Sequence, residues 1–191
     1  MLEIIVQSLM VSLILAPIIG ALILMIIPKW STKMAWVSSS VISAICLCMS
    51  ILIFLAYNPI FGGNQYIVNI SWLTGSFNVD FSLALNGISS SMVLLNGVVL
   101  FGACLISNNI ANRSRDFFVL LLVLGGGVFG VFLSSNLFFF FLFYELAVLP
   151  MYLLIAIWGS STDFGSFVRT KEYGAMKLMM VLVAASVLIW I

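Results

Sequence analysis

The sequence predicts an all-α, polytopic membrane protein of about six transmembrane helices. Hydrophobic residues make up 64% of its 191 positions, charged residues make up only 7%, and the mean hydropathy is +1.30. A water-soluble globule needs far more polar surface than this composition supplies. The apolar residues gather in long runs without the alternating pattern of a β-barrel. Because backbone in lipid must satisfy its own hydrogen bonds, these runs are predicted to be helices.

Six apolar runs are each long enough to cross a hydrocarbon core about 30 Å thick. The first run lacks a basic segment before it and a clear cleavage site after it, so we interpret it as a retained span rather than a signal peptide. Short polar breaks separate most runs, and such breaks make neighbouring helices antiparallel. The predicted spans cover residues 9–27, 34–57, 88–108, 117–133, 137–158 and 174–191.

The loop at residues 58–85 is long, and it contains the two β-forming stretches QYIVNISWL and SFNVDFSLAL. These stretches predict a short hairpin outside the membrane. We therefore divide the chain into residues 1–86, a two-helix region with this external loop, and residues 87–191, which hold the third to sixth helices.

Glycines thin the fourth predicted helix on one side, where Gly126 and Gly130 form a GxxxG motif. The motif predicts close helix packing. A thin helix beside a polar site also admits water, so both interpretations stay open.

The basic residues predict the orientation of the chain. Lys and Arg occur in the first, third and fifth loops and are absent from the second and fourth. By the positive-inside rule, the odd-numbered loops are cytoplasmic and the N-terminus lies outside. The residues behind this prediction are Lys29, Lys33, Arg113, Arg115, Arg169 and Lys171.

Composition also argues against several classes of function. The net charge is +1 without a basic patch, so no nucleic-acid partner is expected. The cysteines, Cys46, Cys48 and Cys104, lie inside apolar runs without a CxxC pair, and the chain contains no histidine. We therefore expect no metal, haem or iron–sulfur site, and the absence of a dinucleotide fingerprint predicts no cofactor-binding residues on this chain.

Glu145 is a single carboxylate inside the apolar run at residues 137–158, about 12 Å from the start of the predicted helix. An ionised carboxylate at that depth costs about 2.5–3.5 kcal/mol even on the most lenient scale. Burial disfavours the charged form of such a group and a nearby cation favours it, so a site with both influences can load and release protons. We predict that Glu145 carries protons. The structural alternative is a carboxylate that only joins helices, with Pro150 a common membrane-helix kink.

Lys177 is the second candidate for the proton path, near the start of the sixth predicted helix. If that helix begins at Gly174, Lys177 lies about 5 Å from the cytoplasmic face and Glu145 about 20 Å from it. A direct pair is then not expected unless the helix begins nearer Phe167. Waters or other polar groups would otherwise connect the two, or Lys177 simply extends to the membrane surface.

The run ELAVLPMYLLIAIWG at residues 145–159 resembles the fifth transmembrane helix of the M-type antiporter-like subunit of respiratory complex I, called NADH dehydrogenase subunit 4 in mitochondria. Its flanks are similar to that family too: RSRDFF at 113–118, AMK at 175–177 and AAS at 184–186. The segment NGIS at 86–89 also matches, except that the family usually carries Asp at the position of Asn86.

The resemblance implies the N-terminal part of a fold of about fourteen helices, with the start of the first antiporter-like repeat at residues 87–191. In that family the glutamate matching Glu145 pairs with a lysine on the seventh helix, and a lysine matching Lys177 belongs to the same polar axis. Inverted repeats of this kind place a transport site near the bilayer midplane. We expect the 191 residues to be an N-terminal fragment.

The implied function is a proton-translocating membrane subunit of an NADH:quinone oxidoreductase. NADH, flavin, iron–sulfur clusters and quinone would sit on partner subunits, and the expected partners are other complex I membrane subunits, the lipid bilayer and protons. The expected location is a bacterial plasma membrane or the mitochondrial inner membrane. Two alternatives remain: a subunit of a multisubunit sodium/proton antiporter, and a structural membrane scaffold.

Overall fold

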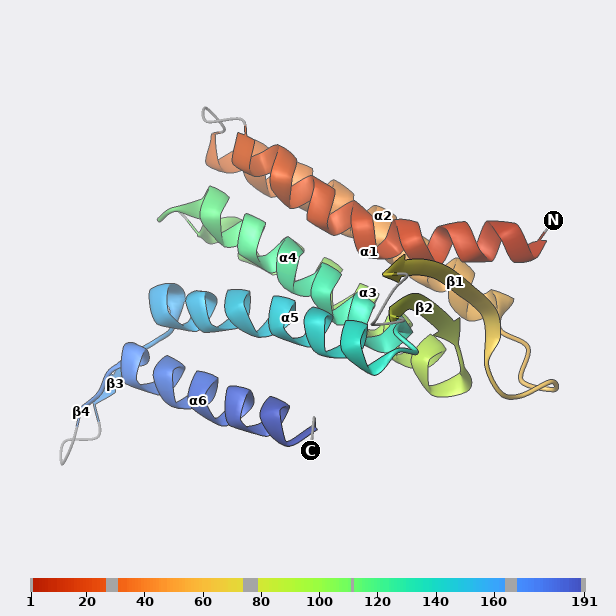
Figure 1. Cartoon of the computed structure of the whole chain (residues 1–191). Coiled ribbons are helices and arrows are strands. Elements are labelled where there is room, and N and C mark those ends of the chain that lie inside the picture. Colours follow the sequence, from red (N-terminus) through yellow and green to blue (C-terminus); the bar gives the residue numbers. More distant parts are fainter. Residues whose placement is uncertain (1, 27–30, 74–78, 111, 164–167, 190–191) are drawn as a thin grey trace.

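The computed structural model describes residues 2–26, 31–73, 79–110, 112–163 and 168–189. Long helices of alternating direction lie side by side and form an elongated bundle (Figure 1). Their bounds are α1 (Leu2–Ile26), α2 (Thr32–Ala56), α3 (Gly87–Ile106), α4 (Ser114–Leu133), α5 (Leu137–Trp158) and α6 (Lys171–Ile189). Among the described helices, α1 to α5 are long and apolar enough to cross a membrane.

All six predicted helices are present, and α5 has the predicted bounds, but α6 is not among the candidate spans of the described residues. Five helices begin earlier than the hydropathy placed them, α2 and α3 by one or two residues and α1, α4 and α6 by three or more. The last three start with polar turns that contain Glu3, Asp116 and Glu172. Acidic side chains favour a helix N-terminus, so a helix can extend beyond its apolar run. Lys29, on which the predicted orientation partly rests, lies outside the described residues. So do residues 190–191 of the sixth predicted span.

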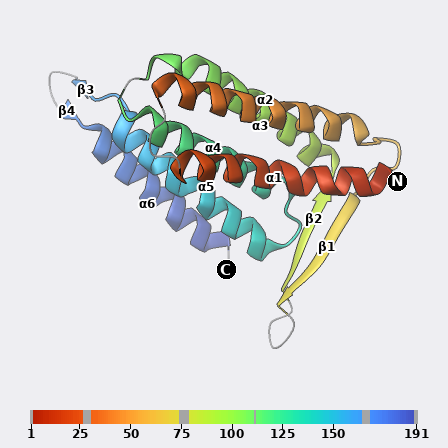
Figure 2. The same cartoon turned by 90° about the horizontal axis from the view of Figure 1, so that it is seen from above.

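The most extensive helix contacts join α4 with α5, α1 with α4, α2 with α3, and α5 with α6 (Figure 2). The most buried of the candidate spans is α4, which contacts α1, α2, α3 and α5. Its side chains Phe118, Leu122 and Phe129 are fully buried in the core. The position of α4 therefore determines how close its neighbours come to one another.

The glycines of α4 approach different neighbours, which corrects the expectation that they thin this helix on one side only. An added Cβ at Gly126 would meet Ile18 of α1, whereas one at Gly130 would meet the Phe143 ring of α5. Gly127 also faces α5, where an added Cβ would lie 3.0 Å from the Ala147 nitrogen. The pair that faces α5 is thus Gly127 and Gly130, spaced three residues apart. Close packing itself is confirmed.

The predicted hairpin is confirmed by β1 (Gln65–Leu73) and β2 (Val79–Leu85), which pair antiparallel. It is tied to the helices at several points. The Ser135 N–H donates to the Ser82 carbonyl at 2.9 Å, and the Gln7 amide donates to the Ile67 carbonyl at 2.9 Å. The ring of Phe81 lies edge-on to that of Phe139, with centroids 4.9 Å apart. These contacts fix the hairpin against α1 and the start of α5.

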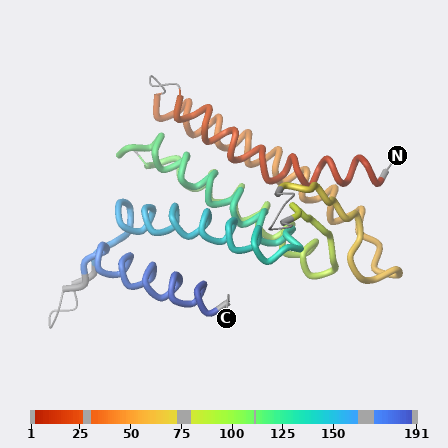
Figure 3. The backbone as a smooth tube through the Cα atoms, in the orientation of Figure 1, coloured from red at the N-terminus to blue at the C-terminus, as the bar shows by residue number. Residues whose placement is uncertain are grey.

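The two ends of the bundle differ in charge. One end carries the finish of α1, α3 and α5 and the start of α2, α4 and α6, whereas the other carries the N-terminus, the hairpin and the α4–α5 turn (Figures 1 and 3). The first end holds Lys33, Arg113, Arg115 and Lys171, and a second, minor pair of strands, β3 (Thr162–Asp163) and β4 (Val168–Arg169). The helix directions therefore agree with the predicted grouping of the basic loops.

We expect the basic end to face the cytoplasm. Asn64 and Asn109 are exposed at opposite ends, so Asn64→Cys should react with a membrane-impermeant maleimide in intact cells and Asn109→Cys should react only after permeabilisation. The unsubstituted chain is the control, because its cysteines lie within α2 and α3. Labelling of position 109 but not of position 64 in intact cells would show that the chain has the opposite orientation.

Gly130→Ala should lower the thermal stability of the detergent-solubilised chain, because the new methyl group overlaps the Phe143 ring and overpacking costs about 1–3 kcal/mol. Gly102→Ala is the matched control, since nothing lies within 4 Å of its added Cβ and Ala favours a helix. The measurement is the loss of the monodisperse size-exclusion peak on heating. Equal midpoints for the two variants would contradict the proposed contact.

Candidate functional site

The helix α5 holds Glu145 near the middle of the bundle. The Asn136 side chain caps the helix by accepting the Phe138 N–H at 2.9 Å, and Glu145 follows about 12 Å further along the axis. The helix continues without interruption through the buried Pro150 to Trp158. Glu145 is half-buried, so the neighbouring helices shield part of its side chain from the surroundings of the bundle.

Ser186 of α6 is the residue that the structure brings to Glu145. Its hydroxyl lies 2.9 Å from Glu145 Oε1 and 2.8 Å from the carbonyl oxygen of Val183, one turn earlier in α6. Ser186 is only 1% exposed, so this contact is shielded. A hydrogen bond to a charged group contributes about 1.5–3 kcal/mol, which is comparable with the cost of placing the carboxylate in the membrane.

A lysine at the basic end holds α6 against α5. Lys171 Nζ donates to the carbonyl of Ile157 at 2.6 Å, in the last turn of α5. The backbone N–H of Lys171 also donates to the Ser161 hydroxyl at 3.3 Å. A cation at a helix C-terminus satisfies carbonyls that lack helical partners. The two helices are thus joined at Ile157 and again at Glu145, about 18 Å apart along α5.

Lys177 lies away from Glu145, although α6 begins at Lys171 and not at the assumed Gly174. It is exposed, and its ammonium group lies 4.7 Å from the centre of the Tyr173 ring. Ser186 comes nine residues later, which is half a revolution around the helix and about 13 Å along it. The two side chains therefore occupy opposite faces of α6, and no ion pair joins Glu145 to Lys177, both of which belong to the described part of the chain.

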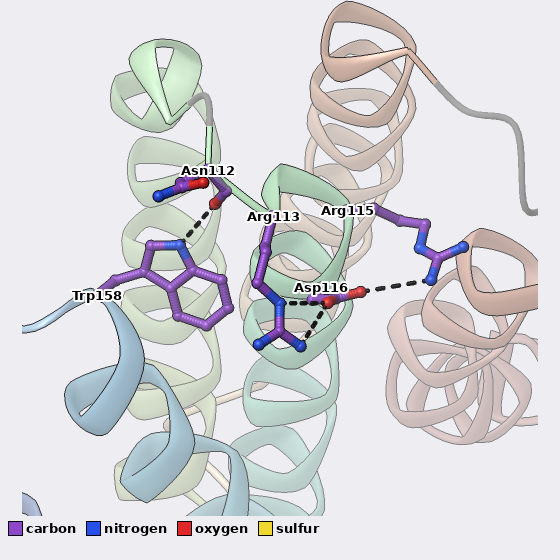
Figure 4. Close-up of polar contacts among 5 residues, drawn as sticks. All are labelled: Asn112, Arg113, Arg115, Asp116 and Trp158. Carbon is purple, nitrogen blue, oxygen red and sulfur yellow. Dashed lines mark hydrogen bonds and ion pairs between the residues drawn. The ribbon is translucent and has the colours of Figure 1, made fainter. Parts of the chain in front are cut away.

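Two segments that resembled the complex I family meet at the basic end. Trp158 Nε1 donates to the carbonyl of Asn112 at 2.9 Å (Figure 4). The Trp158 ring also lies 5.3 Å from that of Phe117, centre to centre. Beside them, Asp116 forms ion pairs with Arg113 at 2.9 Å and with Arg115 at 3.5 Å. This cluster connects the start of α4 to the end of α5.

Asn86 has a structural role that the expected Asp can also fill. Its side chain accepts the N–H of Ser89 at 2.8 Å, and the Ser89 hydroxyl accepts the N–H of Asn86 at 2.8 Å. This reciprocal capping box begins α3. Asn and Asp serve about equally well at this position, so the departure from the family pattern leaves the helix start intact.

Ser186 and Lys171 are the site residues that reasoning from the residue pattern missed. Ser186 was one of several family-like positions, and Lys171 was used only to orient the chain. A partial signal exists, because Ala175 and Ser186 are eleven residues apart and share one face of an α-helix, and both are buried. Which face of α6 meets Glu145 depends on how the helices dock. Among the described residues, no group of three His, Cys, Asp or Glu side chains could hold a metal ion.

Curated sequences give the family of the chain. It is 31% identical over 179 residues to NAD(P)H-quinone oxidoreductase chain 4-2 of Synechocystis sp.. The aligned region covers 93% of this chain and 30% of that protein. It is 35% identical over 173 residues to NAD(P)H-quinone oxidoreductase chain 4 1 of Synechococcus elongatus, covering 90% and 32%. The chain is a homologue of NAD(P)H-quinone oxidoreductase chain 4. It spans about a third of the length of these curated relatives.

Solved structures agree with this chain 4 homologue in fold. A chain of respiratory complex I from Thermus thermophilus with bound NADH matches with a TM-score of 0.68 at 20% identity, covering 92% of this chain and 32% of that one. A chain of the membrane-bound sulfane sulfur reductase, an archaeal respiratory membrane complex, matches with a TM-score of 0.66 at 23% identity, covering 91% and 25%. No protein-family model matches. The chain 4 homologue is therefore a multi-pass membrane protein that shares its fold with chains of these two respiratory complexes.

We expect the effects of Glu145→Gln and Lys177→Gln on stability to be additive. Residues more than about 10 Å apart without shared partners usually add to within about 0.5 kcal/mol. The measurement is a double-mutant cycle of thermal unfolding midpoints in detergent. Glu145→Gln with Ser186→Ala is the contrasting pair, because those residues share a hydrogen bond and should be coupled. Strong coupling between Glu145 and Lys177 would contradict their separation in the structure.

Proposed function

We propose that this chain forms part of a proton-translocating membrane subunit of a quinone-reducing respiratory complex, with Glu145 as the proton carrier. The observation that carries the proposal is the mid-span carboxylate held by a buried hydroxyl from the neighbouring helix. Ionisable groups inside membrane spans mark ion and proton paths by default. Homology to NAD(P)H-quinone oxidoreductase chain 4 supports the quinone-reducing complex as the setting.

The chemistry assigned to this chain is proton transfer rather than electron transfer. A carboxyl group can take up a proton from one side and release it to the other when its surroundings change. NAD(P)H, flavin, iron–sulfur clusters and quinone are assigned to partner subunits, with other membrane subunits of the complex as direct partners. Quinone reduction there would drive Glu145 between its charged and neutral states.

Lys177 is proposed as an entry residue of the path rather than as the direct partner of Glu145. It lies on the basic end of α6, two turns inside the helix start, and it is exposed on the face of α6 that points away from Ser186. A cation at such a position can contact water or a further subunit. A path from Lys177 to Glu145 would have to pass about 13 Å along α6.

Glu145→Gln should preserve assembly and reduce proton translocation about tenfold or more, because the amide keeps the volume and hydrogen bonding of the side chain but does not titrate. Glu145→Asp should retain part of the activity, since the titrating group is drawn back by one methylene. The measurements are quinone reductase activity and proton uptake in membranes that contain each variant, with subunit content checked on native gels.

Tight coupling predicts that quinone reduction falls together with proton uptake, since each proton moved against 100 mV requires about 2.3 kcal/mol. Normal proton uptake in a fully assembled Glu145→Gln complex would leave the carboxylate with a structural role. Proton exchange that depends on sodium and proceeds without quinone would instead favour the antiporter alternative. Loss of assembly with Gln, but not with Asp, would point to helix joining.

A further inference from the structure

We propose that Ser186 is a positioning residue that keeps the Glu145 carboxyl hydrogen-bonded in both of its protonation states by turning its single hydroxyl proton between two acceptors. The inference deepens the function proposed above and rests on it, because it requires that Glu145 changes its protonation state. It concerns how the proton carrier is held, and it assigns a role to a buried side chain of α6.

The geometry offers the hydroxyl two acceptors at nearly equal distances. Ser186 Oγ lies 2.9 Å from Glu145 Oε1 and 2.8 Å from the Val183 carbonyl oxygen. A serine hydroxyl has one proton to donate and two lone pairs with which to accept. It can therefore donate to only one of these oxygens at a time, and rotation about its Cβ–Oγ bond selects which one.

The two arrangements correspond to the two states of the carboxyl group. When Glu145 is ionised, Ser186 donates to Oε1, and the negative charge strengthens this bond. When Glu145 is protonated, its own O–H donates to a lone pair of Ser186 Oγ, and the serine proton turns to the Val183 carbonyl. The O–H bond of Ser186 stays intact throughout, and the proton that enters and leaves is the carboxyl proton.

Another buried serine makes the same local hydrogen bond within its helix but has no carboxylate partner. Ser90 of α3 is also 1% exposed, and its hydroxyl donates to the carbonyl three residues earlier, that of Gly87, at 3.0 Å. Ser186 makes the same local bond to Val183 and has the carboxylate as a further acceptor. Ser90 is thus a matched control for removal of a buried hydroxyl.

Other charged and titratable side chains on the packed elements lie mostly at the basic end. Lys171, Glu172 and Lys177 occupy the first two turns of α6, about 13 Å or more from Ser186 along the helix. Arg115 and Asp116 lie in the first turn of α4, and Tyr144 and Tyr152 belong to α5, as Glu145 does. Among the described residues, the hydrogen bond that joins the Glu145 carboxylate to a neighbouring helix is the one to Ser186.

The test uses the assembly that contains this chain, purified from its native membranes, with the variants Ser186→Ala, Ser186→Thr, Ser186→Cys and Ser90→Ala. Infrared difference spectroscopy should identify the C=O stretching band of the protonated carboxyl group by its loss in Glu145→Gln. In Ser186→Ala this band should move to higher wavenumber, because the acid loses its hydrogen-bond partner. Proton translocation should fall about tenfold, as expected for loss of one hydrogen bond to a charged group.

Ser186→Thr should restore both the band position and the rate, because the hydroxyl is retained. Ser186→Cys keeps the volume but donates weakly, so it should follow Ala, and it decides the question if the Ala variant does not assemble. Ser90→Ala should leave both readouts unchanged.

An unshifted band and an unchanged rate in Ser186→Ala, or in Ser186→Cys, would overturn the inference if Glu145→Gln still reduces translocation as expected. Normal translocation in Glu145→Gln would instead overturn the proposed function. The two failures are therefore distinguishable, because one concerns the hydroxyl and the other concerns the carboxyl group. A shift of equal size in Ser90→Ala would also overturn the inference, since the band would then report general packing.

Discussion

The hydrogen bond between Glu145 and Ser186 is the interaction on which the site depends. A membrane interior supplies no water to a carboxylate, so a donor from the protein must offset the cost of burying it. That donor comes from a different helix, 41 positions later in the chain. The contact therefore requires that α5 and α6 dock in one register, and much of the remaining architecture maintains that docking.

Three contacts along α5 support this register. On one side, Gly127 lets α4 approach the backbone of Ala147 closely, and Gly130 leaves room for the Phe143 ring of α5. On the other side, Lys171 attaches the start of α6 to the last turn of α5. The aromatic contact between Phe81 and Phe139 secures the far end of α5 against the hairpin. Glu145 thus sits on a helix that is fixed at both ends and along its middle.

The sequence predicted the long helices and the hairpin, but it did not predict which face of each helix meets which neighbour. Hydropathy predicted α5 to its terminal residues, and β-forming stretches predicted the hairpin, because both signals are local. The neighbours of Gly126 and Gly130 could not be predicted, since a GxxxG spacing says that a helix is thin but not which helices approach it. Likewise, Ser186 is an ordinary small residue until α6 is docked. Interhelical register arises from tertiary packing, which no single segment encodes.

The separation of charge between the two ends has a consequence for biogenesis. Each consecutive pair, α1 with α2, α3 with α4 and α5 with α6, carries basic residues where its two helices are joined, whereas Glu3 and Asp80 lie at the opposite end. A nascent chain with this pattern can enter the bilayer as three successive helical hairpins, each with its basic tip retained on the side of synthesis. Because α4 belongs to the second hairpin, the glycine-lined surface that receives α5 is already within the membrane before the carboxylate arrives.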